Sequence, residues 1–144
     1  MRRHGLNRVK DWNMGEVVVI KPDQRSFDTA QTSSMVRQAG IATEVCGSRG
    51  LWVGYVSSPP GSSGAHHHGD AESGIYVLHG SIRLHFGDGL ERSIDAETGD
   101  FIYVPSNTVH VEENLSLSEP AELIVARNAS EYLVFNVPDP RELH

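Results

Sequence analysis

Short runs of apolar and β-branched residues, separated by glycine and proline, recur along most of the chain. In the run 51–57 alternate side chains point to opposite faces of a strand, which places Trp52 and Val56 together on one face. The same pattern predicts strands at 16–21, 41–46, 51–57, 75–78, 81–86, 91–96, 101–104, 108–112, 122–126 and 132–137. Many short strands without an amphipathic helix predict an all-β protein, either a β-barrel or a jelly roll.

Other segments of the chain have weaker patterns. Residues 35–39 are expected to form a single helical turn that Gly40 ends. The PPGSSG segment at 59–64 is expected to be a rigid loop that delivers the next strand to the barrel rim. The strand at 101–104 is expected to be buried. We therefore expect one domain over residues 1–144, with its core at about 41–137 and an N-terminal arm at 1–40.

The composition excludes several classes of partner. A net charge of -7 argues against a nucleic acid, which clustered Lys and Arg would bind. The only basic cluster is expected to be a solvated terminus and consists of Arg2, Arg3, Arg8 and Lys10. The single cysteine, Cys46, forms no intramolecular disulfide. Since no apolar run reaches the length of a membrane span or a signal sequence, we expect a soluble, cytoplasmic protein without a membrane partner.

Three adjacent histidines at 66–68 mark the main chemical feature of the chain. On a strand, His66 and His68 point to the same face and can bind one metal ion through neutral imidazole. His67 points away on an ideal strand, but the glycines beside this segment would allow a distortion that turns it inward. Its role, as a fourth ligand or as a solvent-facing residue, stays open.

The segment from Gly99 to Asn114 resembles the second sequence motif of the cupin family. That motif has Gly, five residues, Pro, one residue, Gly, two residues, His, three residues and Asn, and this chain matches it at all positions but one. Asn107 replaces the second glycine, and asparagine tolerates the left-handed conformation better than other side chains. The resemblance implies that His110 is a metal ligand.

The first cupin motif, His-x-His, three or four residues, Glu, six residues and Gly, fits less well. Counting forward from His66 and His68 reaches Glu72, whereas counting back from Gly80 reaches Ser73. The two counts turn opposite faces of the next strand inward: either Gly74 and Tyr76, or Ile75 and Val77. A bulge at Ser73–Gly74 would reconcile them. Glu72 is then either a ligand or a free carboxylate close to the metal.

The resemblance implies a single cupin double-stranded β-helix, which is a jelly-roll barrel, with one divalent transition metal per subunit. An imidazole-rich site suits zinc, our first expectation, with iron, nickel or copper as alternatives. The expected ligands are His66, His67, His68 and His110, with Glu72 as the catalytic base. The aromatic residues expected to contact substrate are Trp52, Tyr55, Tyr76 and Phe101.

The triple histidine, the following Gly-x-x-Glu-Ser and the Ile-Tyr-Val-Leu strand resemble small single-domain cupins that act as aromatic polyketide cyclases of the resistomycin type. This resemblance implies aldol condensation and dehydration of a poly-β-keto chain, free or bound to a carrier protein, in antibiotic biosynthesis. The alternatives are an iron-dependent cupin dioxygenase acting on a small aromatic or thiol, and a non-catalytic ligand sensor. Apolar runs at 17–20 and 133–137 would leave open sheet edges, so we expect a homodimer.

Overall fold

The computed structural model describes residues 15–32, 34–130 and 132–142. The basic cluster near the N-terminus lies outside these residues. The strands are β1 (Val36–Ile41), β2 (Trp52–Ser58), β3 (Gly61–Ser62), β4 (His66–His67), β5 (Ser73–His79), β6 (Ser81–Phe86), β7 (Arg92–Glu97), β8 (Phe101–Val104), β9 (Val111–Asn114), β10 (Ala121–Arg127) and β11 (Phe135–Asn136). The short helices are η1 (Pro22–Gln24), α2 (Thr43–Cys46) and η2 (Pro140–Glu142).

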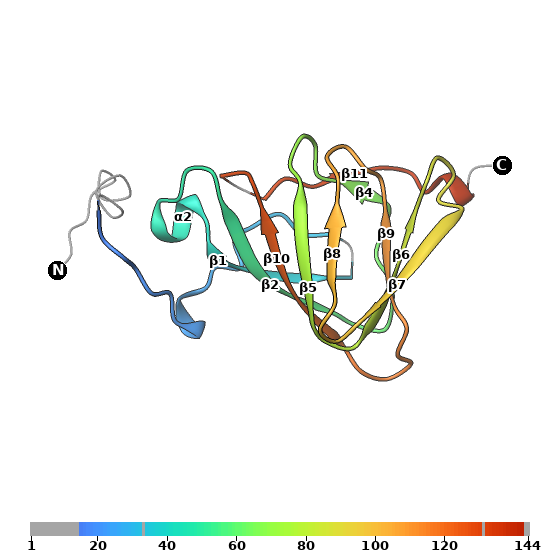
Figure 1. Cartoon of the computed structure of the whole chain (residues 1–144), viewed down its shortest axis with the longest axis horizontal. Helices are drawn as coiled ribbons and strands as arrows, with labels where there is room; N and C mark the ends of the chain where they lie inside the picture. The colour runs from blue at the N-terminus through green and yellow to red at the C-terminus, as the bar shows by residue number, and fades with distance from the viewer. Residues whose placement is uncertain (1–14, 33, 131, 143–144) are drawn as a thin grey trace.

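The strands form two main antiparallel sheets. One sheet has the order β1-β2-β10-β5-β8, and the other has the order β3-β9-β6-β7. A separate two-stranded pair joins β4 to β11. Figure 1 shows the first sheet at the left and centre, with β9, β6 and β7 to its right. This architecture confirms the expected all-β jelly roll.

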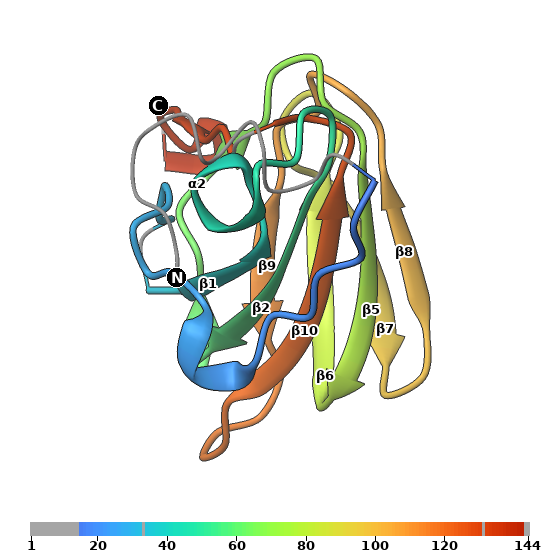
Figure 2. The same cartoon turned by 90° about the vertical axis from the view of Figure 1, so that its left-hand side faces the viewer.

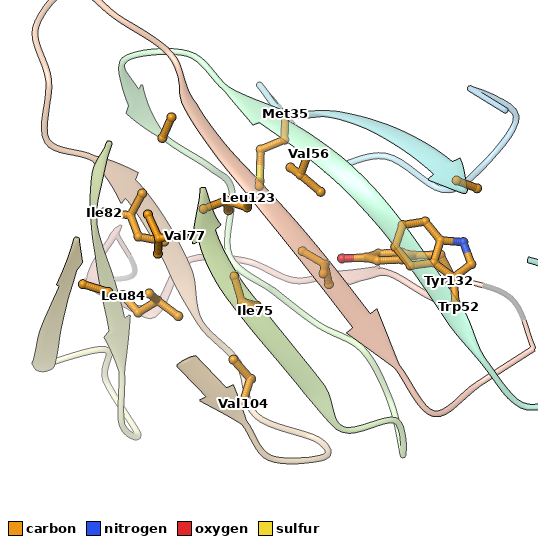
Figure 3. Close-up of a cluster of buried hydrophobic side chains, with 14 of the residues drawn as sticks. Met35, Trp52, Val56, Ile75, Val77, Ile82, Leu84, Val104, Leu123 and Tyr132 are labelled. Atoms are coloured by element: carbon orange, nitrogen blue, oxygen red, sulfur yellow. The ribbon is translucent and has the colours of Figure 1, made fainter. Parts of the chain in front are cut away.

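The core lies between the two sheets. In β2, β5 and β10 of the five-stranded sheet, alternate side chains are buried, and Figure 3 shows them facing Ile82 and Leu84 of strand β6 in the other sheet. Val56, Val77 and Leu123 are completely buried. Burying each such side chain contributes roughly 1.5–3 kcal/mol to the free energy of unfolding. The barrel is therefore held together by apolar packing across the sheets.

The N-terminal half corrects several sequence predictions. The predicted strand at 16–21 is wrong: the segment is irregular, and the side chain of Val17 is 96% exposed. Figure 2 shows this segment passing across β2 and β10. A β-branched run becomes a strand only where a sheet edge pairs with it, and no strand among the described residues does so here.

Two further predictions in this half are also wrong. Residues 35–39 contribute to strand β1, in which Arg37 and Ala39 are buried. A buried arginine at an inward position hides the alternation that identifies a strand. The predicted strand at 41–46 contains helix α2 instead, which ends at Gly47 with a φ of 75°. The sheet therefore begins at Val36, five positions before the expected core.

The C-terminal half follows the predictions more closely, with three differences. Strand β8 lies at the edge of its sheet, and Phe101 is 82% exposed, so the expectation of a buried strand there is wrong. The last strand is only Phe135–Asn136, and it pairs with β4 rather than with a main sheet. The loop at 59–64 includes the short strand β3. None of the helices among the described residues is long and apolar enough to cross a membrane.

Candidate functional site

Backbone pairing brings the two histidine-bearing segments together. His66 and His110 form an isolated antiparallel bridge, in which each backbone N–H donates to the carbonyl of the other, at 3.1 and 2.9 Å. The side chains of paired residues lie on the same face of a sheet. Residues that are far apart in the sequence therefore share one site.

The imidazoles of His66, His68 and His110 form a buried cluster. One ring nitrogen from each residue lies within 4.8 Å of the others. The ring centroids are 4.4 Å apart for His66 and His110 and 4.9 Å apart for His66 and His68. These three residues are the only group of potential metal ligands found among the described residues. The structure thus brings together three of the four histidines expected to bind a metal.

The orientation of each ring is fixed by a backbone carbonyl. The Nδ1 atoms of His66, His68 and His110 lie 2.8, 2.8 and 2.9 Å from the carbonyl oxygens of Gly64, Leu133 and Thr108. An Nδ1–H that donates to a carbonyl leaves the lone pair on Nε2, which is the tautomer that binds metal. The Nε2 atoms of His66 and His68 are buried and have no hydrogen-bond partner among the described residues.

A buried carboxylate that the sequence analysis did not predict, Glu112, lies beside two histidines of the cluster. Its carboxylate is 7% exposed, and Oε2 lies 3.3 Å from Nε2 of His110 and 3.7 Å from Nε2 of His66. The signal was present in the sequence, because residues two apart on a strand share a face and Glu112 follows His110 at that spacing. The first cupin motif prescribes a glutamate and the second does not, so the motifs alone do not point to Glu112.

Burial and neighbouring charges determine the ionisation of these groups. Burial, followed by the positive charge of Arg127, lowers the pKa of His68 to about 2. Burial also lowers the pKa of His66. Burial would raise the pKa of Glu112, but His110 and His66 beside it hold that pKa well below its usual range. The neutral form is therefore favoured for the rings of His66 and His68, and the ionised form is favoured for the Glu112 carboxylate.

This arrangement fits a metal ion. One ring nitrogen of each of the three histidines lies in the same small region, and lone pairs that face one another repel unless a cation lies between them. A site of three imidazoles suits zinc, iron, nickel or copper better than magnesium or calcium, which prefer oxygen ligands. The three buried histidines thus form a site of the kind that binds a divalent transition metal.

The structure does not bring His67 into this cluster. Its ring stacks on Phe135, with centroids 5.0 Å apart, and its Nδ1 accepts a hydrogen bond from the backbone N–H of Gly69. The pairing of β4 with β11 places Phe135 opposite His67 and accounts for this orientation. The imidazole follows the alternation of an ideal strand, and the distortion that would turn it inward does not occur.

The carboxylate of Glu72 also lies away from the histidines. It accepts a hydrogen bond of 2.8 Å from the hydroxyl of Tyr103, and both residues are exposed. Ser73 is buried instead, as are Ile75 and Val77, so the count back from Gly80 gives the observed register. Pairing through Ser73 and Gly74 is regular, and the irregularity in β5 lies between His79 and Val77.

The four aromatic residues expected to contact substrate do not gather around the histidines. Trp52 points into the core, where its ring lies edge-on to Tyr132 at a centroid distance of 4.3 Å (Figure 3). Tyr55 belongs to the opposite face of β2, where it faces Arg25. Tyr76 and Phe101 pair on the outer face of the same sheet, 4.9 Å apart. Of the four, only Trp52 points inward.

A cleft of about 670 Å³ reaches the histidine cluster through His110. It lies between the edge strand β8 and strands β6 and β7, with Leu84, Ile94, Ile102 and Val104 among its apolar lining residues. Its polar lining residues include Asp88, Arg92, Asn107 and Thr108. Asn107 has a φ of 55°, the left-handed conformation expected for its motif position. The cleft gives an apolar molecule of moderate size a route to the metal-binding groups.

Comparison with solved structures gives several similar folds. The chain resembles the polyketide cyclase RemF from Streptomyces resistomycificus, with 23% identity, a TM-score of 0.63, and coverage of 90% of this chain and 91% of that chain. It also resembles the Bacillus subtilis oxalate decarboxylase OxdC, with 21% identity and a TM-score of 0.65 over 76% of this chain. The chain spans only 30% of that decarboxylase. An oxalate oxidase is similar at 18% identity and a TM-score of 0.68, with 87% and 66% of the two chains covered.

These identities show a shared fold and leave the activity of this chain open. No curated protein matches the sequence. The family model described as a cupin domain matches residues 54–127, just over half of the chain, and this stretch contains all three clustered histidines and Glu112. The chain belongs to the cupin family.

Proposed function

We propose that this protein is a metal-dependent polyketide cyclase that catalyses intramolecular aldol condensation and dehydration of a poly-β-keto chain. The observation that carries the proposal is the convergence of three anchored imidazoles and a buried carboxylate beside an apolar cleft. The similarity to a polyketide cyclase over nearly the full length of both chains supports it. The oxalate enzymes share the fold over a smaller part of their own length.

The reaction requires a base, and it requires a Lewis acid that makes a carbonyl group more electrophilic. A divalent ion, for which zinc is our proposal, would be held by His66, His68 and His110 and would supply Lewis acidity toward a carbonyl oxygen. Glu112 is ionised and can accept a proton from a methylene group between two carbonyls. The resulting carbanion carbon forms a bond to a second ketone carbon, whose oxygen takes up a proton and becomes a hydroxyl group. Loss of a second proton from the attacking carbon then forms a C=C bond, and the hydroxyl group takes up another proton and leaves as water.

The geometry favours Glu112 over Glu72 as the catalytic base. A general base has to lie within hydrogen-bonding reach of the proton it removes, directly or through one water. Glu112 lies beside the imidazole nitrogens, whereas the Glu72 carboxylate is exposed and bonded to Tyr103. The apolar walls of the cleft would fold a flexible chain and exclude water from the reacting carbons.

A homodimer is part of the proposal. On the outer face of the β1-β2-β10-β5-β8 sheet, Phe101, Tyr103 and Leu78 are exposed close to Tyr76. An exposed apolar patch of this kind marks a surface that another protein covers. A second copy of the chain is the partner proposed here.

Incubation of metal-loaded protein with a synthetic poly-β-keto thioester and with the matching free acid tests the function. Mass spectrometry should show cyclised products that have lost water, without oxygen consumption at an oxygen electrode. An iron-dependent dioxygenase, the alternative activity, would consume oxygen and add it to the substrate. Oxygen uptake coupled to substrate loss would therefore overturn the cyclase proposal.

A further inference from the structure

Two arginines are buried inside the barrel without an acidic partner. Arg37 of β1 is 1% exposed, and Arg127 at the end of β10 is 3% exposed. Arg37 donates to the carbonyl of Ala30 at 3.4 Å. Arg127 donates to the hydroxyl oxygens of Ser73 and Tyr132. Neither forms an ion pair with a carboxylate among the described residues, although buried arginines normally have one.

Both guanidinium groups pack against one aromatic ring. The guanidinium carbons of Arg37 and Arg127 lie 4.4 and 4.1 Å from the centre of the Tyr132 ring. The aromatic ring offsets part of the cost of burying two cations, but the two like charges still repel one another. Two buried guanidinium groups that contact the same ring are costly to bury unless a negative group joins them.

Donor groups around the same ring have no hydrogen-bond partner. The Nε atoms of Arg37 and Arg127 and the indole Nε1 of Trp52 are buried and unpaired among the described residues. Trp52 lies edge-on to Tyr132, at 4.3 Å between centroids. Buried donors that stay unpaired cost free energy, so such a cluster indicates a place where an acceptor binds.

The cluster adjoins the histidines. The His68 ring lies 5.2 Å from the Tyr132 ring, edge-on. Glu112 is the only buried carboxylate in the described part of the chain, and it already lies among the imidazole nitrogens. Its charge balances that of one arginine at most, and a divalent ion at the histidines would add more positive charge. The interior on this side of the barrel therefore carries an excess of positive charge.

We propose that Arg37 and Arg127, together with the indole N–H of Trp52, bind an anionic oxygen group of the substrate beside the metal site. The group is a carboxylate or an enolate, both of which present an oxygen acceptor with negative charge to guanidinium donors. The proposal deepens the proposed function, on which it rests for the reaction: the preferred substrate is an acid or a ready enol rather than a fully neutral ketone.

Binding to the full-length, metal-loaded protein tests this site without turnover. Isothermal titration calorimetry would compare 4-oxopentanoate with its neutral amide, 4-oxopentanamide, which has the same ketone and chain. We expect the acid to bind at least about tenfold more tightly than the amide. Acetylacetone, titrated in the same way, serves as the enolate probe. Equal binding of acid and amide, with no binding of acetylacetone, overturns the proposal.

Substitutions identify the groups responsible. Arg37→Met and Arg127→Met remove one charge each while keeping a long side chain, and each is expected to reduce anion affinity tenfold or more with metal content unchanged. Arg127→Lys should restore part of the affinity. Arg83→Met is the matched control, because Arg83 is exposed and paired with Asp95, and it should bind like the wild type. If the buried-arginine variants fold and bind the acid like the wild type, the site is wrong.

The probes separate the two sources of negative charge and also separate this proposal from the cyclase activity. If the arginine substitutions weaken the binding of 4-oxopentanoate alone, the bound group is a carboxylate. If they weaken the binding of acetylacetone, the bound group is an enolate. The cyclase activity itself is measured independently with the thioester. Cyclisation without anion selectivity overturns the anion site and leaves the cyclase proposal intact. Anion selectivity without cyclisation of either substrate supports the anion site and overturns the cyclase proposal.

Discussion

The Nε2 atom of His110 lies 3.3 Å from Oε2 of Glu112, while Nδ1 of the same ring lies 2.9 Å from the carbonyl oxygen of Thr108. The imidazole is thus held on one side by the backbone and faces a buried carboxylate on the other. Such an arrangement is typical of metal ligands whose orientation is fixed by a hydrogen bond to the outer nitrogen. His110 also lines the cleft, so it links the metal-binding groups to the route by which substrate would arrive.

Replacement of this histidine should remove the metal without unfolding the barrel. We expect His110→Ala to lose most of its bound metal, because one of three imidazole ligands is removed, and to keep its β-sheet circular dichroism, because apolar packing holds the fold. Elemental analysis of purified protein measures the metal. His67→Ala is the matched control, since the His67 ring stacks on Phe135 outside the cluster. Unchanged metal content in His110→Ala would place the metal elsewhere.

The two glutamates can be separated by the same conservative change. Glu112→Gln keeps the shape and one oxygen, so the variant should retain its metal, but turnover should fall about 10²-fold or more because the base is lost. Glu72→Gln should keep both metal and turnover, since that carboxylate bonds to Tyr103 on the outside of the barrel. Metal content and the rate of cyclisation are the measurements. Loss of turnover in Glu72→Gln alone would restore Glu72 as the base.

Residue spacing predicted the part of the site that depends on strand alternation. His66 and His68 share a face, and Asn107 takes the left-handed conformation expected from its place in the motif. Spacing alone left two registers open at Glu72 and Ser73, and the packing of Ile75 and Val77 into the core selects one of them. The pattern of residues along one strand does not show which of its two faces will pack against apolar residues of the opposite sheet.

The buried arginines explain much of what the sequence did not reveal. Arg37 occupies an inward position of β1, so a charged residue interrupts the apolar alternation and the strand is missed. Arg127 is similarly placed by its charge outside the predicted strand at 122–126, although it is the last residue of β10 and its side chain lies inside the barrel. Polar residues that serve a binding site break the pattern from which strands are recognised. The errors in β1 and the overlooked arginine site therefore have the same cause.

The stability of the metal-free protein should fall in mild acid. The pKa of His68 is lowered from 6.5 to about 2 in the folded state, chiefly by burial. Between these two pKa values the His68 ring is protonated in the unfolded chain but not in the folded protein. The free energy of unfolding is therefore highest above about pH 6.5. It decreases as the pH falls below that value, by up to about 1.4 kcal/mol per pH unit for this residue. Urea denaturation with a chelator at pH 7.5 and 5.5 measures this dependence.

Two variants make the pH experiment specific. His68→Gln should show a weaker loss of stability between the two pH values, because the buried imidazole is absent. His79→Gln, at an exposed position, should keep the pH dependence of the wild type. Identical pH dependence in wild type and His68→Gln would contradict the assigned role of burial.

Strands β1 and β2 approach each other closely at Gly54, where any side chain larger than that of glycine should destabilise the fold. A Cβ atom at Gly54 would overlap the Trp52 ring and lie 2.7 Å from the carbonyl oxygen of Gln38 in the adjacent strand β1. The backbone cannot move away without breaking the pairing of β1 with β2, so Gly54→Ala should lower the free energy of unfolding by about 1–3 kcal/mol. Gly74→Ala is the control, because no atom lies within 4 Å of its added Cβ. Equal stabilities of the two variants in urea would contradict this packing.

The outer face of the five-stranded sheet should mediate dimer formation. Phe101 is 82% exposed in strand β8, and Tyr103 and Leu78 extend the apolar surface. Light scattering at micromolar concentration should give twice the chain mass of 15.8 kDa. Phe101→Asp places a charge in the patch and should shift the protein toward the monomer, because burying an unpaired carboxylate in an interface is costly. Ile94→Asp, on the neighbouring sheet, is the control and should remain dimeric. A wild-type monomer would exclude this interface, and a dimer unaffected by Phe101→Asp would place the contact on another face.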